Sequence, residues 1–437
     1  MQKAENPSVF RLLQLYIQST FHPRIHYAQK HNLNTCIQEP NTLHLQYQIN
    51  IIEIMKSYSL IPMIAFVAMS VSCGPSADTG MMTIDVEKSY SKKELTIDDL
   101  WEVEYIALET DSIFLLPGGQ PQHVGENKLG FVDNRTGNLL FFDAKTGKKA
   151  FCINRKGPGP EEYKSVGALV MDEKSGEIFA WTIFDATFQV YDEQGKHLRT
   201  LQMHNKRKGE YLNITNFINL DDDQLLCSSN NMKGYAVHYL QDKKTGLTTI
   251  VDSIPNERYV SEYIFAEKDG VTYSTAPNLI PFVRTSEGLV YADHSNDTLY
   301  RMTDGMTPSP FIVRTPRVKE TEPNKILRFD NETDDWMFLS GIEMAYDFSS
   351  REGLRQTSYG VEKASGEIYE LKFIHPDYEG KEYSPTALNA RYYPADELLT
   401  ALEEGKLKGK LKEIASTLGE EDNGVVMLLK RKGNGQN

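Results

Sequence analysis

The sequence predicts an all-β fold, because short runs of β-branched and aromatic residues alternate with turn signals from residue 96 onward and a hairpin signature recurs along this stretch. Repeats of about 40–50 residues that each hold several strands are typical of propeller blades. We therefore expect a six-bladed β-propeller over residues 96–432, with a short helical insertion near its C-terminal end.

The residues before the propeller divide into three parts. Residues 1–54 contain neither Gly nor Asp, and we expect a non-native upstream extension that is disordered or helical. Residues 55–72 read as a lipoprotein signal peptide, with Lys56 ahead of an apolar stretch over 60–69 that is too short to span a membrane. A buried helix is the alternative. The segment 73–95 is expected to be a polar tether.

Cys73 is the expected lipidation site. The small residue Ser72 directly before it resembles a bacterial lipobox, although Ser70 stands where Leu is usual. Acyl chains on Cys73 would anchor the protein stably in a membrane. Gly74 after the cysteine favours the outer membrane, where the protein would be periplasmic or surface-exposed.

The hairpin signature is an apolar strand ending in an aromatic residue and Asp, followed by a turn with Gly and Lys. Its first two copies, 141–148 and 190–196, place Asp143 and Asp192 49 residues apart. Weaker copies follow at 238–246, 299–305 and 359–366. Asp and Gly suit the tight turn that joins two antiparallel strands.

Two further segments complete the predicted ring. The apolar strands 101–108 and 424–430 lie at the two ends of the domain, and together they would form a sixth blade that leaves no long free sheet edge. Pro394 begins a segment in which Leu and Ala recur at helical spacing up to Leu418. This helical stripe either packs against the propeller or binds a partner.

Residues 154–163 carry a family resemblance. This segment, with Gly157, Pro158, Gly159, Glu162 and Tyr163, resembles the G-x-G-P-x-E-Y segment between blades of six-bladed β-propeller lipoproteins from anaerobic Gram-negative bacteria, a family similar to the NHL and TolB propellers. The ending over 422–430 is similar to the closing strand of that family. The resemblance implies a fold but no chemistry, because propellers host many functions.

Composition and motifs exclude several functions. With 47 Lys and Arg against 61 Asp and Glu, the net charge of −14 argues against nucleic acid as a partner. Four cysteines without a C-x-x-C pair exclude a zinc ribbon and a thioredoxin-type site. Nucleophile-elbow, H-E-x-x-H, phosphate-loop and EF-hand motifs are absent from the sequence, so no cofactor or metal is assigned.

Three places are candidates for ligand binding at a channel mouth. Two polar groups follow apolar strands at corresponding positions of their blades, and Trp181 occupies the matching place in the second blade. The polar groups comprise Asp133, Asn134 and Arg135 in one blade and Asp293, His294 and Asn296 in another. Asx-turns are the structural alternative for them. Trp181 could stack on a sugar ring or pack between blades.

The sequence therefore leads to two functional hypotheses. The first is a membrane-anchored binding or scaffolding module without catalytic residues, whose partner is an envelope protein or a glycan. The second is a metal-dependent hydrolase or lyase with its site in the axial channel, since side chains gathered from several blades would escape a search for linear motifs.

Overall fold

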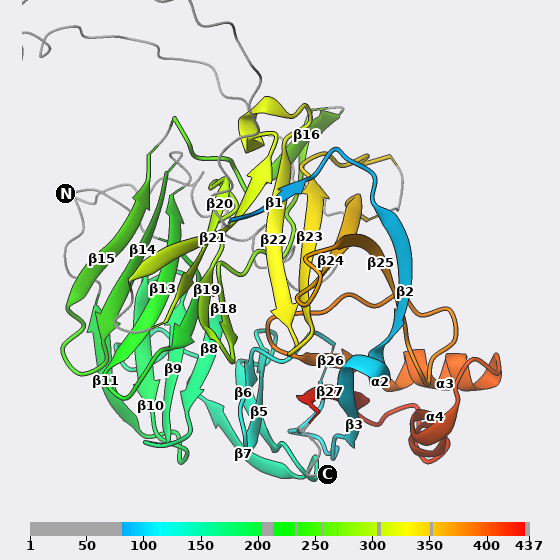
Figure 1. Ribbon diagram of the computed structural model, residues 1–437. Coiled ribbons are helices and arrows are strands. Elements are labelled where there is room, and N and C mark those ends of the chain that lie inside the picture. Colours follow the sequence, from blue (N-terminus) through cyan, green and yellow to red (C-terminus); the bar gives the residue numbers. More distant parts are fainter. Residues whose placement is uncertain are drawn as a thin grey trace, which may run out of the picture.

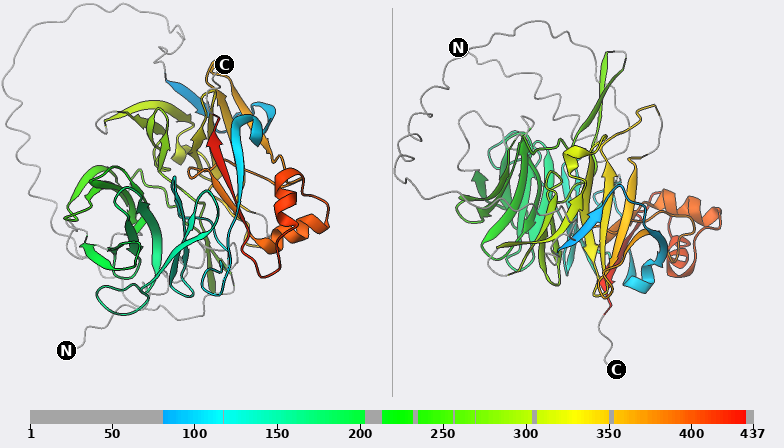
Figure 2. Two further views of the ribbon diagram at one scale, coloured as in Figure 1. Left: turned by 90° about the horizontal axis from the view of Figure 1, so that it is seen from below. Right: turned by 45° about the horizontal axis from the view of Figure 1, so that its top comes forward.

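Six β-sheets stand around a common axis in the part of the chain that the computed structural model describes, residues 81–432 except 117, 203–212, 232–234, 256, 269, 304–306 and 350–352. The ring is visible in Figure 1 and in the left view of Figure 2. The predicted six-bladed β-propeller is confirmed. The expected upstream extension, signal peptide and Cys73 lie outside the described residues.

Blades 1 to 3 each have four antiparallel strands, of which the first lies nearest the axis. Blade 1 comprises β4 (His123–Val124), β5 (Lys128–Asp133), β6 (Asn138–Asp143) and β7 (Lys149–Asn154). Blade 2 comprises β8 (Val166–Asp172), β9 (Glu177–Thr182), β10 (Thr187–Tyr191) and β11 (His197–Gln202). Blade 3 comprises β12 (Asn213–Asn219), β13 (Gln224–Asn231), β14 (Tyr235–Asp242) and β15 (Thr248–Ile254).

Blades 4 to 6 include strands from the N-terminal end of the described chain. Blade 4 comprises β18 (Phe282–Thr285), β19 (Gly288–Tyr291), β20 (Thr298–Met302), β21 (Pro308–Thr315) and β1 (Met82–Asp85). Blade 5 comprises β22 (Lys325–Glu332), β23 (Trp336–Glu343), β24 (Gln356–Glu362), β25 (Ile368–Ile374) and β2 (Ser91–Thr96). Blade 6 comprises β26 (Ala390–Tyr393), β27 (Val425–Arg431) and β3 (Trp101–Ala107). The hairpin of β16 (Ile264–Lys268) and β17 (Val271–Thr275) lies between blades 3 and 4, and η1 (Val318–Glu320) precedes blade 5.

The recurring hairpin signature forms the turn between the third and fourth strands of blades 1, 2, 3 and 5, whereas the turn residues of the copy at 299–305 lie outside the described residues. In blade 1 the Asp143 carboxylate accepts hydrogen bonds from the backbone N–H groups of Lys145 (3.1 Å) and Thr146 (2.8 Å). Gly147 ends the turn with φ +68°, a conformation that disfavours residues with a Cβ. Asp242 and Gly246 repeat this geometry in blade 3. The repeat in the sequence therefore reflects the same turn, closed by an Asp carboxylate and a Gly with positive φ, in different blades.

The hydrophobic core consists of clusters that fill the interfaces between neighbouring blades. The central strands of a blade are buried on both faces, because a neighbouring blade packs on each side. This explains why the sequence of β6 is a continuous apolar run. Leu139 and Phe141 face blade 2, whereas Leu140 and Phe142 face blade 6. Equivalent clusters lie at the other interfaces between adjacent blades. The ring is therefore held by side chains that alternate between the two neighbours of each blade.

We call residues 82–107 the N-terminal strap, because its three strands cover the outer edges of three consecutive blades. β1 pairs in parallel with β21, and β2 pairs in parallel with β25. β3 then pairs antiparallel with β27, which closes the ring as predicted. Two of these strands fall within the segment 73–95 that we expected to be a tether. The polar, largely solvent-facing sequence of Ser91–Thr96 gave no strand signal.

Three short helices flank this side of the ring. α2 (Ile97–Leu100) links β2 to β3, and the predicted helical insertion forms α3 (Ala395–Glu403) and α4 (Gly409–Ala415). Figure 1 shows α3 and α4 outside the ring, beside β2 and β3. Leu398 and Leu411 are fully buried in the cluster that joins blades 5 and 6, so the apolar stripe packs against the propeller. None of the helices in the described part of the chain is long and apolar enough to cross a membrane.

Candidate functional site: the axial cavity

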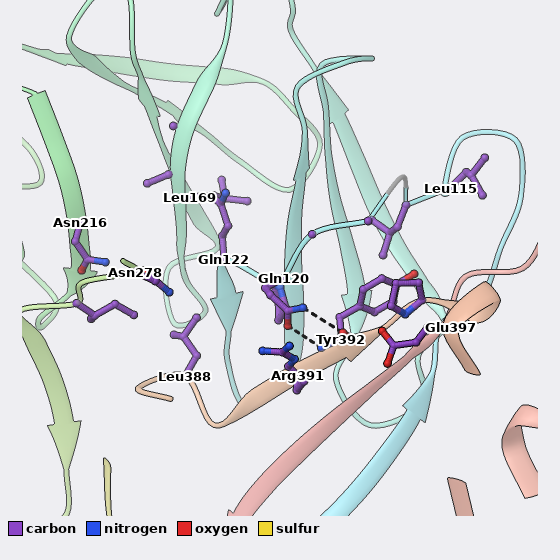
Figure 3. A pocket seen from close by; sticks show the side chains of 18 of the residues that line it. Leu115, Gln120, Gln122, Leu169, Asn216, Asn278, Leu388, Arg391, Tyr392 and Glu397 are labelled. Atoms are coloured by element: carbon purple, nitrogen blue, oxygen red, sulfur yellow. Dashed lines mark hydrogen bonds between the residues drawn. The ribbon is translucent and has the colours of Figure 1, made fainter. Parts of the chain in front are cut away.

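A cavity of about 1530 Å³ lies on the propeller axis. Its wall is formed by the inner strands or the segments just before them. These contribute Gln122 from blade 1, Leu169 from blade 2, Asn216 from blade 3, Asn278 from blade 4 and Arg391 from blade 6. Figure 3 shows these side chains from close by. A volume of this size exceeds the roughly 300–1,000 Å³ of most small-molecule pockets, so the cavity can hold an extended ligand.

Arg391 is the one lysine or arginine among the described residues that line the cavity. Its side chain is exposed, and within the described part of the chain no carboxylate lies within 4 Å of its guanidinium. Its strand is held in place by Gln120, whose side chain accepts a hydrogen bond from the Tyr392 backbone N–H (2.8 Å) and donates one to the Tyr392 carbonyl (3.1 Å). Figure 3 shows Arg391 between Gln120 and Leu388. A fixed backbone therefore presents a guanidinium that is available to a ligand.

Carboxamide side chains occupy other parts of the wall. Gln122 Oε1 and Asn216 Oδ1 are buried atoms that accept no hydrogen bond within the described structure. A buried acceptor without a donor costs free energy, on the order of 1–3 kcal/mol. Asn278 is exposed to the cavity, and its backbone carbonyl accepts a hydrogen bond from Arg328 (2.9 Å). Of these three carboxamides, the exposed Asn278 is the one that a ligand in the cavity can reach directly.

Carboxylates also line the cavity. Seven carboxylates are among the described lining residues, namely Asp111, Glu262, Asp396, Glu397, Glu420, Glu421 and Asp422. Glu397 pairs with Lys381 (2.7 Å), and Asp111 pairs with Lys149 (2.7 Å). The hydrogen bond from Lys149 lowers the pKa of Asp111 to about 2. In Figure 3 Glu397 lies well apart from Asn216 and Asn278, whereas Glu262 lies near these carboxamides, because it lines a small void together with Thr215 and Ile280.

Blade 5 contributes a buried polar network beside the axis. Arg328 Nη2 donates to Ser340 Oγ (3.4 Å), and the Ser340 hydroxyl donates to Asp330. Burial raises the pKa of Asp330, although Arg328 opposes this shift. Because Arg328 also donates to the Asn278 carbonyl, the network fixes the loop that carries one of the cavity carboxamides.

The first group of predicted site residues forms a turn between β5 and β6. Asp133 accepts hydrogen bonds from the Arg135 N–H (2.9 Å) and the Thr136 hydroxyl (2.6 Å), which is an Asx-turn. Asn134 reaches blade 2, where it donates to the Val166 carbonyl (2.8 Å) and accepts from the Val166 N–H (2.9 Å). The Arg135 side chain points outward and is 69% exposed. The two hydrogen bonds of Asn134 therefore join blade 1 to blade 2.

The second group lies close to the cavity. Asp293 is buried and accepts a hydrogen bond from His238 Nε2 (2.9 Å), and its other oxygen accepts from the Ser295 N–H (2.8 Å). Burial alone would raise the pKa of Asp293, but His294 and His238 outweigh it and bring the pKa to about 2. Asp293 and His294 line a void of about 10 Å³, the size of one water molecule. The Asn296 N–H donates to the Asp293 carbonyl (3.0 Å).

Trp181 lies at the interface of blades 2 and 3. It is 1% exposed and packs against Phe188, with ring centroids 5.1 Å apart. It belongs to the hydrophobic cluster between these blades and does not line the axial cavity.

Within the described residues, no three His, Cys, Asp or Glu side chains converge in a way that could hold a metal ion. The carboxylates around the cavity are therefore spread along its wall. Cys152 and Cys227 lie in different blades, and both are free thiols.

Sequence reasoning missed the residues that line the cavity. Arg391, Asn216 and Asn278 are far apart in the chain, and none belongs to a linear motif. A usable signal was nevertheless present, because polar residues interrupt the apolar pattern of the first strand of several blades. Asn216 within Asn213–Asn219 and Arg391 within Ala390–Tyr393 are examples.

The fold and the site can now be set against known proteins. The family described as domain of unknown function DUF4934 matches residues 81–430, which include every blade and the strap. The chain belongs to this family. No protein of curated function matches the sequence.

Two solved structures from Bacteroides are similar to this chain. A Bacteroides fragilis protein inferred to be exported shares 15% identity with a TM-score of 0.53, and the alignment covers 80% of this chain and all of that one. A member of the DUF4221 family from Bacteroides vulgatus shares 14% identity with a TM-score of 0.42, covering 76% of this chain and 98% of that one. At this identity the first likeness supports the shared fold alone.

Proposed function

We propose that this DUF4934 protein is a binding module whose ligand occupies the axial cavity. One observation carries the proposal: the cavity is large, and its wall presents the exposed Asn278 and the exposed guanidinium of Arg391, which has no ion-pair partner in the described part of the chain. A large concave pocket with a few polar groups in its wall is typical of a ligand-binding site. The rigid ring keeps them in place.

The second part of the proposal is that the module is held at the outer membrane through acyl chains on Cys73. The lipobox-like sequence before Cys73 supports it, as does the inferred export of the Bacteroides fragilis protein with the same fold. The partner would then be an envelope protein or a glycan. Eight residues lie between Cys73 and the start of β1 at Met82. A chain of that length reaches at most about 30 Å, so the ring would stay close to the bilayer.

Ligand binding can be tested by thermal unfolding with envelope extract separated into peptide, glycan and lipid fractions. We expect at least one fraction to raise the melting temperature, since a ligand at a hundred times its Kd adds about 2.7 kcal/mol. The variant Asn278→Trp fills the cavity from an exposed loop and should abolish the shift. Gln194→Trp, on an outer turn of blade 2, is the matched control. If no fraction shifts the melting temperature, or if Asn278→Trp responds like the control, the cavity is not the binding site.

The anchor can be tested separately. We expect the full chain to incorporate an alkyne-tagged fatty acid in a Gram-negative host and to sediment with membranes. Cys73→Ser should do neither. Equal labelling of both proteins would contradict lipidation at Cys73.

A further inference from the structure

The axial cavity has features that specify the chemistry of its ligand. Arg391, the carboxamides and the carboxylates each restrict what can bind, and together they favour one class of molecule. We propose that the cavity binds a short peptide whose free C-terminal carboxylate pairs with Arg391. This inference rests on the proposed function of the cavity as a binding site.

The first argument concerns Arg391. A guanidinium presents a planar set of donors that matches a carboxylate with two parallel hydrogen bonds. Arg391 is exposed in the cavity without an ion-pair partner in the described structure, while its strand is fixed by both hydrogen bonds of Gln120. The cavity therefore contains one preformed place for a single carboxylate.

The second argument concerns the carboxamides. A carboxamide side chain offers both donors and an acceptor, which is the pattern that a peptide bond needs. Gln122 and Asn216 are half-buried in the wall of the cavity, and Asn278 is exposed to it. These three residues come from three blades, so they can follow the backbone of an extended ligand across the cavity.

The third argument concerns charge and excludes polyanions. The described lining has seven carboxylates against the single guanidinium of Arg391. An acidic polysaccharide with a carboxylate on every sugar would meet repulsion along most of the wall. A peptide with free ends carries one carboxylate and one ammonium group, and the ammonium can lie beside one of the carboxylates of the wall.

The fourth argument concerns apolar contacts. Leu115 and Leu388 line the cavity and are 42% and 37% exposed. In Figure 3 they lie on opposite sides of Arg391. They can contact the apolar side chains of a peptide, whereas sugar rings would gain less from them. The volume of about 1530 Å³ leaves room for several residues.

The test uses the full chain, purified in detergent, and two pools of tetrapeptides with mixed sequences. One pool has free C-terminal carboxylates, and the other has amidated C-termini. Peptides retained by the protein after rapid gel filtration are quantified by mass spectrometry. We expect retention from the free pool to exceed retention from the amidated pool at least tenfold. Acetylation of the peptide N-terminus should lower retention by a smaller factor.

Arginine variants assign the effect to Arg391. Arg391→Gln should reduce retention of the free pool at least tenfold, and Arg391→Lys should recover part of it, because lysine keeps the charge but not the fork of donors. Arg355→Gln is the matched control, since the Arg355 side chain is 85% exposed and does not line the cavity. Unchanged melting temperatures would show that each variant is folded.

Several results would overturn the inference. Equal retention of the two pools, or full retention by Arg391→Gln, would show that Arg391 does not hold a C-terminal carboxylate. Retention of tri-galacturonate in place of peptides would assign the cavity to an acidic glycan. If peptides fail while an envelope fraction still stabilises the wild type and not Asn278→Trp, only the peptide inference is wrong. If no ligand depends on the cavity, the proposed function is wrong as well.

Discussion

Blades 1 to 3 have four strands each, whereas blades 4 and 5 have five and blade 6 has three, and the two halves of the ring are secured in different ways. The first three blades are joined by polar contacts between neighbours. Glu173 in blade 2 accepts hydrogen bonds from the Lys128 N–H (2.8 Å) and the Asn127 N–H (3.0 Å) in blade 1. Lys243 in blade 3 pairs with Asp172 in blade 2 (2.8 Å).

Blades 4 and 5 also share ion pairs, such as Arg301 with Glu332 (2.8 Å), but blades 4 to 6 are in addition secured by the N-terminal strap. Its strands add backbone hydrogen bonds to the outer edges of β21, β25 and β27, and its apolar residues join the core between blades. The comparison teaches that one ring can be stabilised locally, by a few charged side chains, and globally, by a segment that connects distant parts of the chain. These two means should respond differently to mutation and to pH.

The largest expected effect is on the strap side. Trp101 on β3 is 1% exposed and packs against Phe338 of blade 5, with ring centroids 5.1 Å apart. Trp101→Ala should lower the free energy of unfolding by about 3–5 kcal/mol, measured by urea denaturation followed by circular dichroism. Trp181→Ala in blade 2 removes a tryptophan of equal burial and should cost a similar amount.

Limited proteolysis separates these two variants. Only Trp101→Ala should become sensitive to cleavage within residues 82–107, because only it loosens the strap. If both variants are cleaved there alike, the strap does not secure its half of the ring independently.

The next largest loss of stability is expected at the polar contacts between blades 1 and 2. Burial raises the pKa of Glu173, but hydrogen bonds from His123, Asn127 and Lys128 outweigh it and lower the pKa to about 2. Glu173→Gln should lower the free energy of unfolding at pH 7 by about 1.5–3 kcal/mol. The folded pKa lies below the ordinary value of 4.5, so this stabilisation is present above pH 4.5 and is lost as the pH falls toward 2.

The measurement is the urea midpoint of both proteins at pH 7, 5 and 3. The difference between wild type and Glu173→Gln should shrink at pH 3. Glu126→Gln, in the neighbouring turn and exposed, is the control that should change little. A difference that is constant with pH would show that the charge of Glu173 is not what joins these blades.

A smaller effect is expected at Tyr163, between blades 1 and 2. Its hydroxyl donates to the Gly137 carbonyl (2.7 Å) and accepts from the Arg155 N–H (3.1 Å), so it ties the segment over 154–163 to the turn between β5 and β6. Tyr163→Phe keeps the buried ring but leaves these groups unpaired, which should cost about 1–2 kcal/mol in urea denaturation. No loss of stability would show that the ring alone secures the segment.

The smallest loss of stability is expected for a residue of the strap, Lys93. The Lys93 ammonium lies 4.5 Å from the centre of the Trp336 ring, across the outer edge of blade 5. Lys93→Gln should cost about 0.5–1 kcal/mol, and Lys92→Gln on the exposed face of the same strand should cost less. A larger loss at Lys92 would contradict this assignment.

The fold was predictable where local chemistry repeats. Asp143, Gly147 and their counterparts mark the outer turns of the blades, and the apolar run of β6 marks a central strand of its sheet. The ring closure by β3 and β27 followed from the need to leave no free edge. The strap was not predictable, because Ser91–Thr96 is polar and its partner β25 is a distant, parallel strand.

The candidate site was less predictable than the fold. Asp293 and His294 were found because they follow an apolar strand, and they lie beside the cavity. Arg391 and Asn216 were not found, because their shared location depends on the curvature of the whole ring. A cavity lined from five separate blades leaves only single polar residues in the sequence.

The strap also sets the order in which the protein can be completed. Met82 pairs with Ile312, 230 residues later, Ser91 pairs with Tyr369, and Trp101 pairs with Arg431. During synthesis the strap strands therefore emerge first and remain without partners until the last blades have formed. Blades 1 to 3 can assemble from neighbouring segments, whereas ring closure waits for the C-terminal strand. A chain truncated before Val425 would keep most of its blades and lose the step that locks them into a ring.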